Sequence, residues 1–219
     1  MDVKNLSLRI VGASLFCVFS NTHAVLIGGI EFPDGAVSFA DSVFSYSPGA
    51  DVGAVWDNPT AALGIPDYPP AGNAVSLGDG GELILQFTDN SLTTSSDDTP
   101  DLHIFEIGGT TEWMNVAISR NAIDWLDLGD VLGQPTSIDI DAVAGVVEDE
   151  LYSYVRISDI PPNQTGFPFG EADIDAVGAI SSGAPVAVPE PSNLALMGLG
   201  LLGLAFGRVT GKHTLRNQR

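Results

Sequence analysis

The chain has 219 residues, of which 44% are hydrophobic and 16% are charged, and it contains 25 glycines and 14 prolines. This composition excludes a disordered chain and favours one turn-rich globular domain without long helices. The formal net charge of −20 excludes nucleic-acid binding and docking on anionic lipid, because such a surface repels phosphate groups.

The first 24 residues have the pattern of a secretory signal peptide. Lys4 and Arg9 precede an apolar run over 10–19, and small residues before and at Ala24 fit a signal peptidase site. We therefore expect export, with cleavage after Ala24. The alternative, an N-terminal helix of the domain, would need an amphipathic period that the run lacks. The single cysteine, Cys17, lies in this run, so the mature chain would form no disulfide.

The segment 25–184 is predicted to fold as one all-β domain. Its apolar runs are short, several of them alternate with period two, and turn residues separate them. In 82–88, Leu83, Leu85 and Phe87 would face a core while the intervening residues face mainly solvent. A parallel α/β fold is disfavoured because no run keeps a helical period over three turns.

Nine strands are expected in this segment. The longer ones fall at 36–46, 82–88, 102–107, 113–119, 152–158 and 174–180, and shorter ones lie near Val75, Trp125 and Ile138. Together they predict two antiparallel sheets packed face to face, a jelly-roll-like β-sandwich. The proline-rich segment 52–74 is expected to be a long loop packed across the sandwich. The sequence similarity between 138–143 and 174–177 is too short to indicate a repeat.

Acidic residues near two of these strands predict a metal site. Asp98, Asp101 and Glu106 gather around the start of the 102–107 strand, and Asp173 and Asp175 would share a face of another strand. Carboxylates held close together repel one another unless a cation neutralises them, and their oxygens suit Ca²⁺. We therefore expect these five residues to bind a structural Ca²⁺. The alternative is a solvated acidic surface, because no EF-hand spacing is present.

The aromatic residues and the histidine of the body suggest binding more than catalysis. Trp113 is the tryptophan that we expect to be accessible and able to stack on a sugar ring, whereas Trp125 fits a packing role. His103 alternates with its apolar neighbours and is expected at the surface. No Gly-x-Ser-x-Gly motif or His-rich spacing accompanies it, so no catalytic triad is predicted. Glycoside hydrolysis by a carboxylate pair stays open, since acids are abundant.

Two stretches of the body resemble a known fold family. Residues 118–121, Asp124-Trp125 and Leu128-Gly129 resemble the hairpin of discoidin-like jelly rolls, and 154–157 resembles a later strand of that fold. The resemblance implies a jelly-roll body, but a shared fold implies no activity.

The C-terminal end has a motif, an apolar run and a basic tail. The motif Pro189-Glu190-Pro191 ends a stiff linker over 185–191, and residues 192–219 hold an apolar run over 194–206 and then basic residues. This order resembles the PEP-CTERM sorting domain. The resemblance implies transient insertion of a C-terminal transmembrane helix, cleavage by exosortase, and export by a Gram-negative bacterium that makes extracellular polysaccharide. A permanent anchor is the alternative, although 13 residues span only about 20 Å.

The sequence thus favours an exported, non-enzymatic protein of the cell surface or extracellular matrix, stabilised by Ca²⁺. Signal peptidase and exosortase are its expected processing partners. The first alternative is a carbohydrate-binding module for extracellular polysaccharide, with its site among the loops at one end of the sandwich. A glycoside hydrolase is the second alternative.

Overall fold

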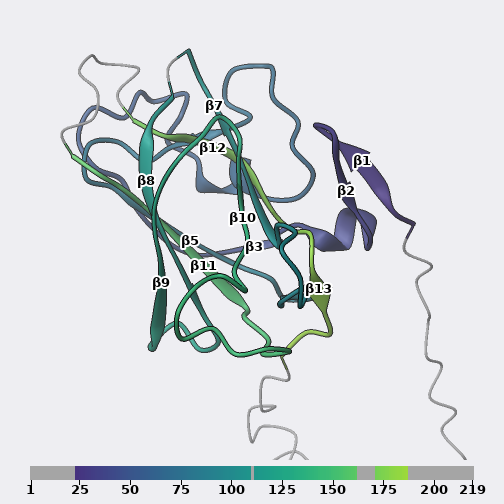
Figure 1. Cartoon of the computed structure of the whole chain (residues 1–219). Coiled ribbons are helices and arrows are strands. Elements are labelled where there is room, and N and C mark those ends of the chain that lie inside the picture. Colours follow the sequence, from purple (N-terminus) through teal and green to yellow (C-terminus); the bar gives the residue numbers. More distant parts are fainter. Residues whose placement is uncertain (1–22, 110, 162–170, 187–219) are drawn as a thin grey trace, which may run out of the picture.

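The computed structural model describes residues 23–109, 111–161 and 171–186. Within these ranges the chain forms two main antiparallel sheets and two short 3-10 helices (Figure 1). One sheet has the order β3 (Ser42–Ser47), β5 (Glu82–Gln86), β11 (Tyr154–Asp159), β8 (Trp113–Ser119) and β9 (Trp125–Leu132). The other has the order β10 (Thr136–Ile138), β7 (Leu102–Ile107), β12 (Asp173–Ala179) and β4 (Val75–Ser76).

The main hydrophobic core lies between these two sheets. Strand β11 shows how alternation builds it, because Val155 and Ile157 are buried while Tyr154, Arg156 and Ser158 are only half buried. The same core takes Leu83 and Leu85 from β5 and Leu102 and Ile104 from β7. The predicted class, an all-β antiparallel sandwich, is confirmed. The narrower likeness to discoidin stays a prediction.

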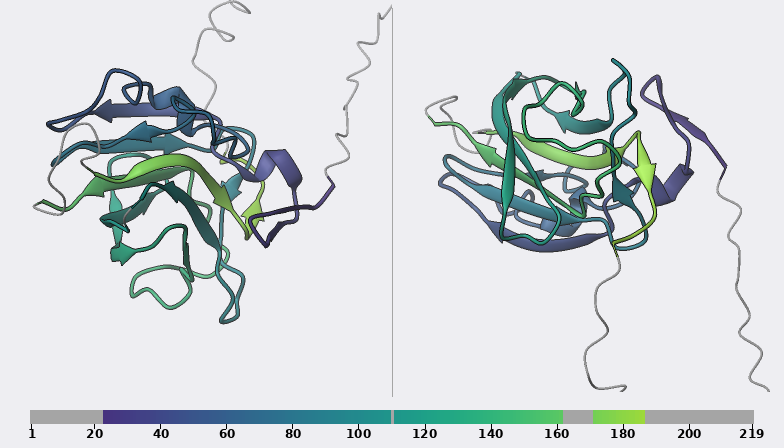
Figure 2. Two further views of the ribbon diagram at one scale, coloured as in Figure 1. Left: turned by 90° about the horizontal axis from the view of Figure 1, so that it is seen from above. Right: turned by 60° about the horizontal axis from the view of Figure 1, so that its bottom comes forward.

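A second, smaller core covers the outer face of the four-stranded sheet. Strands β1 (Val25–Ile27) and β2 (Ile30–Phe32) form a hairpin, followed by the 3-10 helix η1 (Gly35–Ser38), and they lie to one side of the sandwich (Figures 1 and 2). Phe32 and Phe39 pack there on Phe105, with ring centroids 4.6 to 6.1 Å apart. Gly178 makes room for them, since a Cβ at this position would lie 2.5 Å from the Phe32 ring.

Because of this second layer, His103 is buried and not at the surface as expected. The residue does face away from the main core, but the phenylalanine cluster leaves only 3% of it exposed. Its Nδ1 lies 2.6 Å from the hydroxyl of Ser137, and desolvation lowers the pKa of the imidazole to about 4. The prediction was wrong because β7 is buried on both faces, which its own alternation does not reveal.

Several element bounds also differ from the predicted ones. The start of the 36–46 strand is η1 instead, and the segment 52–74 contains a second 3-10 helix, η2 (Pro59–Ala62), packed against β12. A short pair formed by β6 (Ser91–Leu92) and β13 (Ser182–Gly183) was not predicted. In β12 the register shifts between Ile174 and Ala176, so Asp175 occupies a β-bulge.

Candidate functional site

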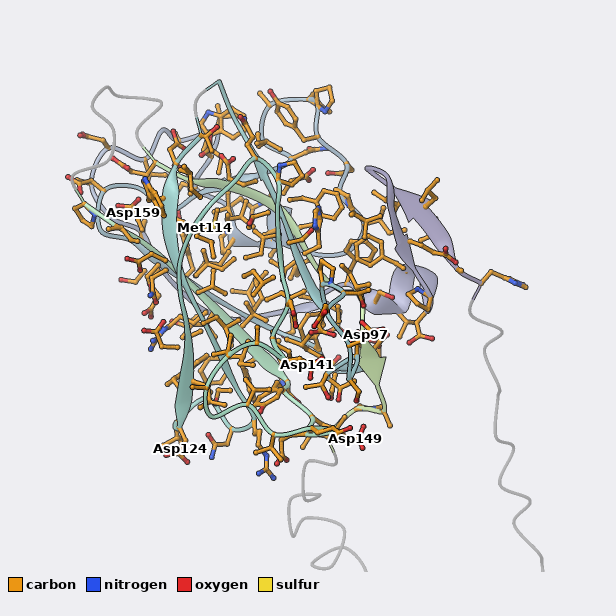
Figure 3. The ribbon with its side chains drawn as sticks, in the orientation of Figure 1. Asp97, Met114, Asp124, Asp141, Asp149 and Asp159 are labelled. Atoms are coloured by element: carbon orange, nitrogen blue, oxygen red, sulfur yellow. The ribbon has the colours of Figure 1, made fainter. Side chains whose placement is uncertain are left out.

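Among the described residues, carboxyl groups gather at three separate places, and each group has at least one buried member. The first group is Asp101, Asp139 and Asp141, the second is Asp79, Asp159 and Glu171, and the third is Glu106, Glu112 and Asp173. Figure 3 shows that Asp141 and Asp159 lie on different sides of the sandwich. The five predicted Ca²⁺ ligands are therefore divided among different surroundings.

Asp101 joins the first group from the residue immediately before β7. It is fully buried, and its Oδ2 accepts a hydrogen bond from the backbone N–H of Ile140 at 2.9 Å. One carboxylate oxygen each of Asp101, Asp139 and Asp141 lie within 4.8 Å of one another. Neither Asp139 nor Asp141 was predicted as a ligand, although the Asp-x-Asp spacing that joins them is visible in the sequence.

The other predicted ligands do not reach Asp101. Asp98 is exposed in the loop before β7. Glu106 stands near the far end of β7, about 16 Å away at the usual rise per residue, so one ion cannot contact both Asp101 and Glu106. Asp175 is already engaged, because its Oδ1 accepts hydrogen bonds from the N–H groups of Asp67 and Tyr68 at 3.1 and 3.4 Å. Asp175 thereby attaches the proline-rich loop to the sheet.

In the third group, two carboxyl groups have raised pKa values. Burial, together with the charges of Glu112 and Asp173, raises the pKa of Glu106 to about 9. Burial also raises the pKa of Asp173 to about 6 against the opposing effect of a hydrogen bond with Ser76. Glu106 is therefore protonated at neutral pH when no cation is bound beside it.

The second group holds two neighbouring buried carboxyl groups. Asp159 and Glu171 are both buried, and desolvation together with the Asp159 charge raises the pKa of Glu171 to about 8. The backbone N–H of Gly80 donates to Oδ2 of Asp159 at 2.9 Å. Residues 162–170, which connect this pair, lie outside the described residues, and we assign the pair no ligand.

A groove of about 620 Å³ opens at the end of the sandwich where β8 turns into β9. Trp125, Tyr152 and Tyr154 line it beside the apolar side chains of Ile118 and Leu126. Its polar lining comes from the β8–β9 turn and from the loop before β11, namely Arg120, Asn121, Asp124 and Glu150. This size and this mixture of aromatic and polar groups are typical of small-ligand sites.

The polar side of the groove is held in place by local contacts. Oδ1 of Asn121 accepts hydrogen bonds from the N–H groups of Ile123 and Asp124, both at 2.9 Å, which fixes the turn. Nε of Arg120 lies 3.0 Å from Oε1 of Glu150 and so ties the turn to the facing loop. The groove walls are therefore linked to each other before any ligand binds.

The two tryptophans of this sheet occupy opposite ends of it. Trp113 is 45% exposed, as expected, but it begins β8 and pairs with Leu132. Trp125 pairs with Ser119 at the other end, about 20 Å away, where it lines the groove and stacks under the guanidinium of Arg156 at 4.7 Å. In Figure 3 the neighbouring residues Met114 and Asp124 mark these two ends. A role for Trp113 in ligand binding stays a prediction.

Residues 187–209 match the family model of the PEP-CTERM protein-sorting motif. The chain carries a signal for sorting by exosortase. Pro189, Glu190 and Pro191 fall inside the match, which indicates an exported, cell-surface-associated protein. No curated protein matches the chain in the comparison made.

The predicted terminal segments lie mostly outside the described residues. These are the signal peptide 1–24, of which only residues 23 and 24 are described, and the sorting helix and tail 192–219. Among the described residues, no helix is long and apolar enough to cross a membrane. The boundaries at 184 and 191 also stay predictions.

Proposed function

We propose that this protein is a non-enzymatic component of the cell surface or extracellular matrix, delivered there by its PEP-CTERM motif. The match at 187–209 carries the proposal, because it indicates export whatever the sandwich binds. The acidic body supports it further, since all but two of the 28 acidic residues lie between residues 25 and 188 beside only Arg120 and Arg156. Such a charge keeps a secreted domain soluble and away from anionic lipid.

Replacing Pro189, Glu190 and Pro191 with alanine should prevent the processing that releases the body from the membrane. We expect the wild-type protein to lose its C-terminal tail and the variant to stay membrane-bound at full mass. Fractionation followed by intact mass measurement tests this, with Thr214→Ala, outside the matched motif, as the control. An intact C-terminus in all mature wild-type protein would defeat the cleavage, and full-length protein in the cytosol would defeat export.

The groove favours a second candidate function, binding of an extracellular polysaccharide. Trp125 and Tyr154 offer flat apolar faces on which the C–H groups of a sugar ring can pack, and Asn121, Asp124 and Glu150 offer hydrogen-bonding groups for hydroxyls. Because the body is strongly acidic, a neutral polysaccharide fits better than an anionic one. The position agrees with a ligand site among the loops at one end of the sandwich.

Substituting Trp125 with alanine should weaken polysaccharide binding by roughly 5- to 150-fold, since a buried aromatic contact contributes on the order of 1–3 kcal/mol. A glycan array with neutral and acidic members, followed by titration of the neutral glycan that binds, provides the measurement. Trp113→Ala is the matched control and should bind like the wild type. If Trp113→Ala loses binding while Trp125→Ala keeps it, the site lies at the other end of the sheet. Turnover of the bound glycan would instead establish a hydrolase.

A further inference from the structure

The carboxylate of Asp101 is a buried group with one oxygen that lacks a hydrogen-bond donor. The residue is 0% exposed, and its Oδ2 accepts from the N–H of Ile140. Its Oδ1 is shielded from solvent and has no hydrogen-bond partner among the described residues. Folded proteins retain a buried carboxylate when it is paired with a cation or coordinates a metal, because an isolated one is costly to desolvate.

Neither arginine of the body is placed to neutralise Asp101. Nε of Arg120 lies 3.0 Å from Glu150, and Nε of Arg156 lies 3.8 Å from Glu82. The sequence has no other lysine or arginine between residues 25 and 188. No cationic side chain is therefore available to Asp101, so an ionised Asp101 needs an external cation as its charge partner.

Two further carboxylates face Asp101 from the segment after β10. Asp139 accepts a hydrogen bond at Oδ1 from the N–H of Asp141 at 2.9 Å, which fixes the two residues relative to each other. Oδ2 of Asp141 accepts from the N–H groups of Ser95 and Ser96 at 3.1 and 2.9 Å. Three acidic groups are thus held by backbone contacts with one oxygen of each within 4.8 Å of the others, although like charges repel at such distances.

We propose that Asp101, Asp139 and Asp141 bind one Ca²⁺ ion. Oxygens that already lie within 4.8 Å of one another need only small side-chain movements to reach Ca²⁺–oxygen distances of about 2.3–2.6 Å. Ca²⁺ accepts such an irregular arrangement, whereas Mg²⁺ demands near-octahedral geometry at about 2.0–2.1 Å. The group has no histidine or cysteine, so its chemistry does not favour zinc. Water and backbone carbonyls supply the remaining ligands that Ca²⁺ takes.

Such an ion would join chain segments that are distant in sequence. Asp101 leads into β7, and its carbonyl oxygen accepts hydrogen bonds from the N–H groups of Ile180 and Ser181 after β12. Asp141 holds the loop that contains Ser95 and Ser96, where Asp97 also lies, as Figure 3 shows beside Asp141. Bound Ca²⁺ therefore stabilises the native state, in which these segments meet, over the unfolded chain, in which they do not.

Calcium titration of the purified full chain, first stripped with a chelator, tests the site. We expect one Ca²⁺ to bind per chain in calorimetry, and we expect millimolar Ca²⁺ to raise the melting temperature by roughly 5 °C or more. The double variant Asp139→Asn/Asp141→Asn should lose both the heat of binding and this shift. In chelator it should melt at or above the wild-type temperature, because the repulsion is relieved. Asp79→Asn, in the second acidic group, should respond to Ca²⁺ like the wild type.

Asp139 and Asp141 are substituted in preference to Asp101, because Asp101→Asn would also alter the hydrogen bond from the N–H of Ile140. A change in stability could then not be attributed to Ca²⁺ binding alone. The single variant Asp139→Asn, which should weaken Ca²⁺ binding at least tenfold, covers the case in which the double variant does not fold. A wild-type melting temperature that Ca²⁺ leaves unchanged would overturn the proposal. So would an equal Ca²⁺ response in the wild type and in Asp139→Asn, or an equal response to Mg²⁺ at the same concentration.

Discussion

The protein should become less stable between pH 7 and pH 9, and replacing Glu106 with glutamine should abolish a large part of this loss. Glu106 is 2% exposed, and its pKa is raised to about 9 from an ordinary value of 4.5 by burial and by the charges of Glu112 and Asp173. Across this range Glu106 is protonated in the native state and ionised in the unfolded state. The free energy of unfolding therefore falls as the pH rises, by up to about 1.4 kcal/mol per pH unit.

Urea titrations of the wild type and of Glu106→Gln at several pH values provide the measurement. From pH 7 to pH 9 the wild type should lose about 2 kcal/mol more than the variant. His103 does not disturb this range, because its native pKa of about 4 and its ordinary value of 6.5 both lie below it. The loss caused by Glu171, whose pKa is raised to about 8, remains in both proteins.

Glu31→Gln is the matched control, because Glu31 is exposed on the β1–β2 hairpin and its variant should keep the wild-type slope. If Glu106→Gln also keeps that slope, Glu106 is ionised in the native state and the buried acidic group is stabilised in another way.

Truncating Phe32 to alanine should destabilise the protein by about 3–5 kcal/mol, because a fully buried ring is replaced by a cavity. Its ring packs on Phe39 and Phe105, and Gly178 has no side chain with which to fill the space. The cost falls on the second core alone, which the β1–β2 hairpin closes over the four-stranded sheet. Thermal and urea denaturation measure it, with a decrease in melting temperature of roughly 10 °C expected.

Leu26→Ala tests whether that effect is specific to the buried face of the hairpin. Leu26 lies in β1, but 72% of it is exposed, so its loss should change stability by less than about 0.5 kcal/mol. Equal effects of Phe32→Ala and Leu26→Ala would mean that the hairpin does not form the cover described above.

Much of the sandwich could be predicted because strand alternation is a local property. Leu102 to Ile107 and Trp113 to Ser119 form strands with the predicted bounds, and Leu83 and Leu85 enter the core as expected. The outer face of β7 could not be predicted in the same way. His103 and Phe105 alternate correctly, but whether a face meets solvent or a second layer depends on the hairpin at 25–32.

The candidate site was predicted only in part, for a related reason. Of the predicted ligands, Asp101 belongs to the group proposed to bind Ca²⁺. Glu106 lies at the far end of its strand, and the bulge at Asp175 turns that carboxylate to the proline-rich loop. The groove at Trp125 depends on a turn, a loop and a strand end that meet only in the folded chain.

By itself the sequence determined the all-β class, most of the strands and the sorting motif at 187–209, because each of these is written in contiguous residues. Only the tertiary structure decided which carboxylates meet, which aromatic ring lines a groove and which histidine is buried. The physical reason is that Asp101 and Ile140 are 39 positions apart, and contacts of this range are set by how sheets pair and pack, which no local pattern records.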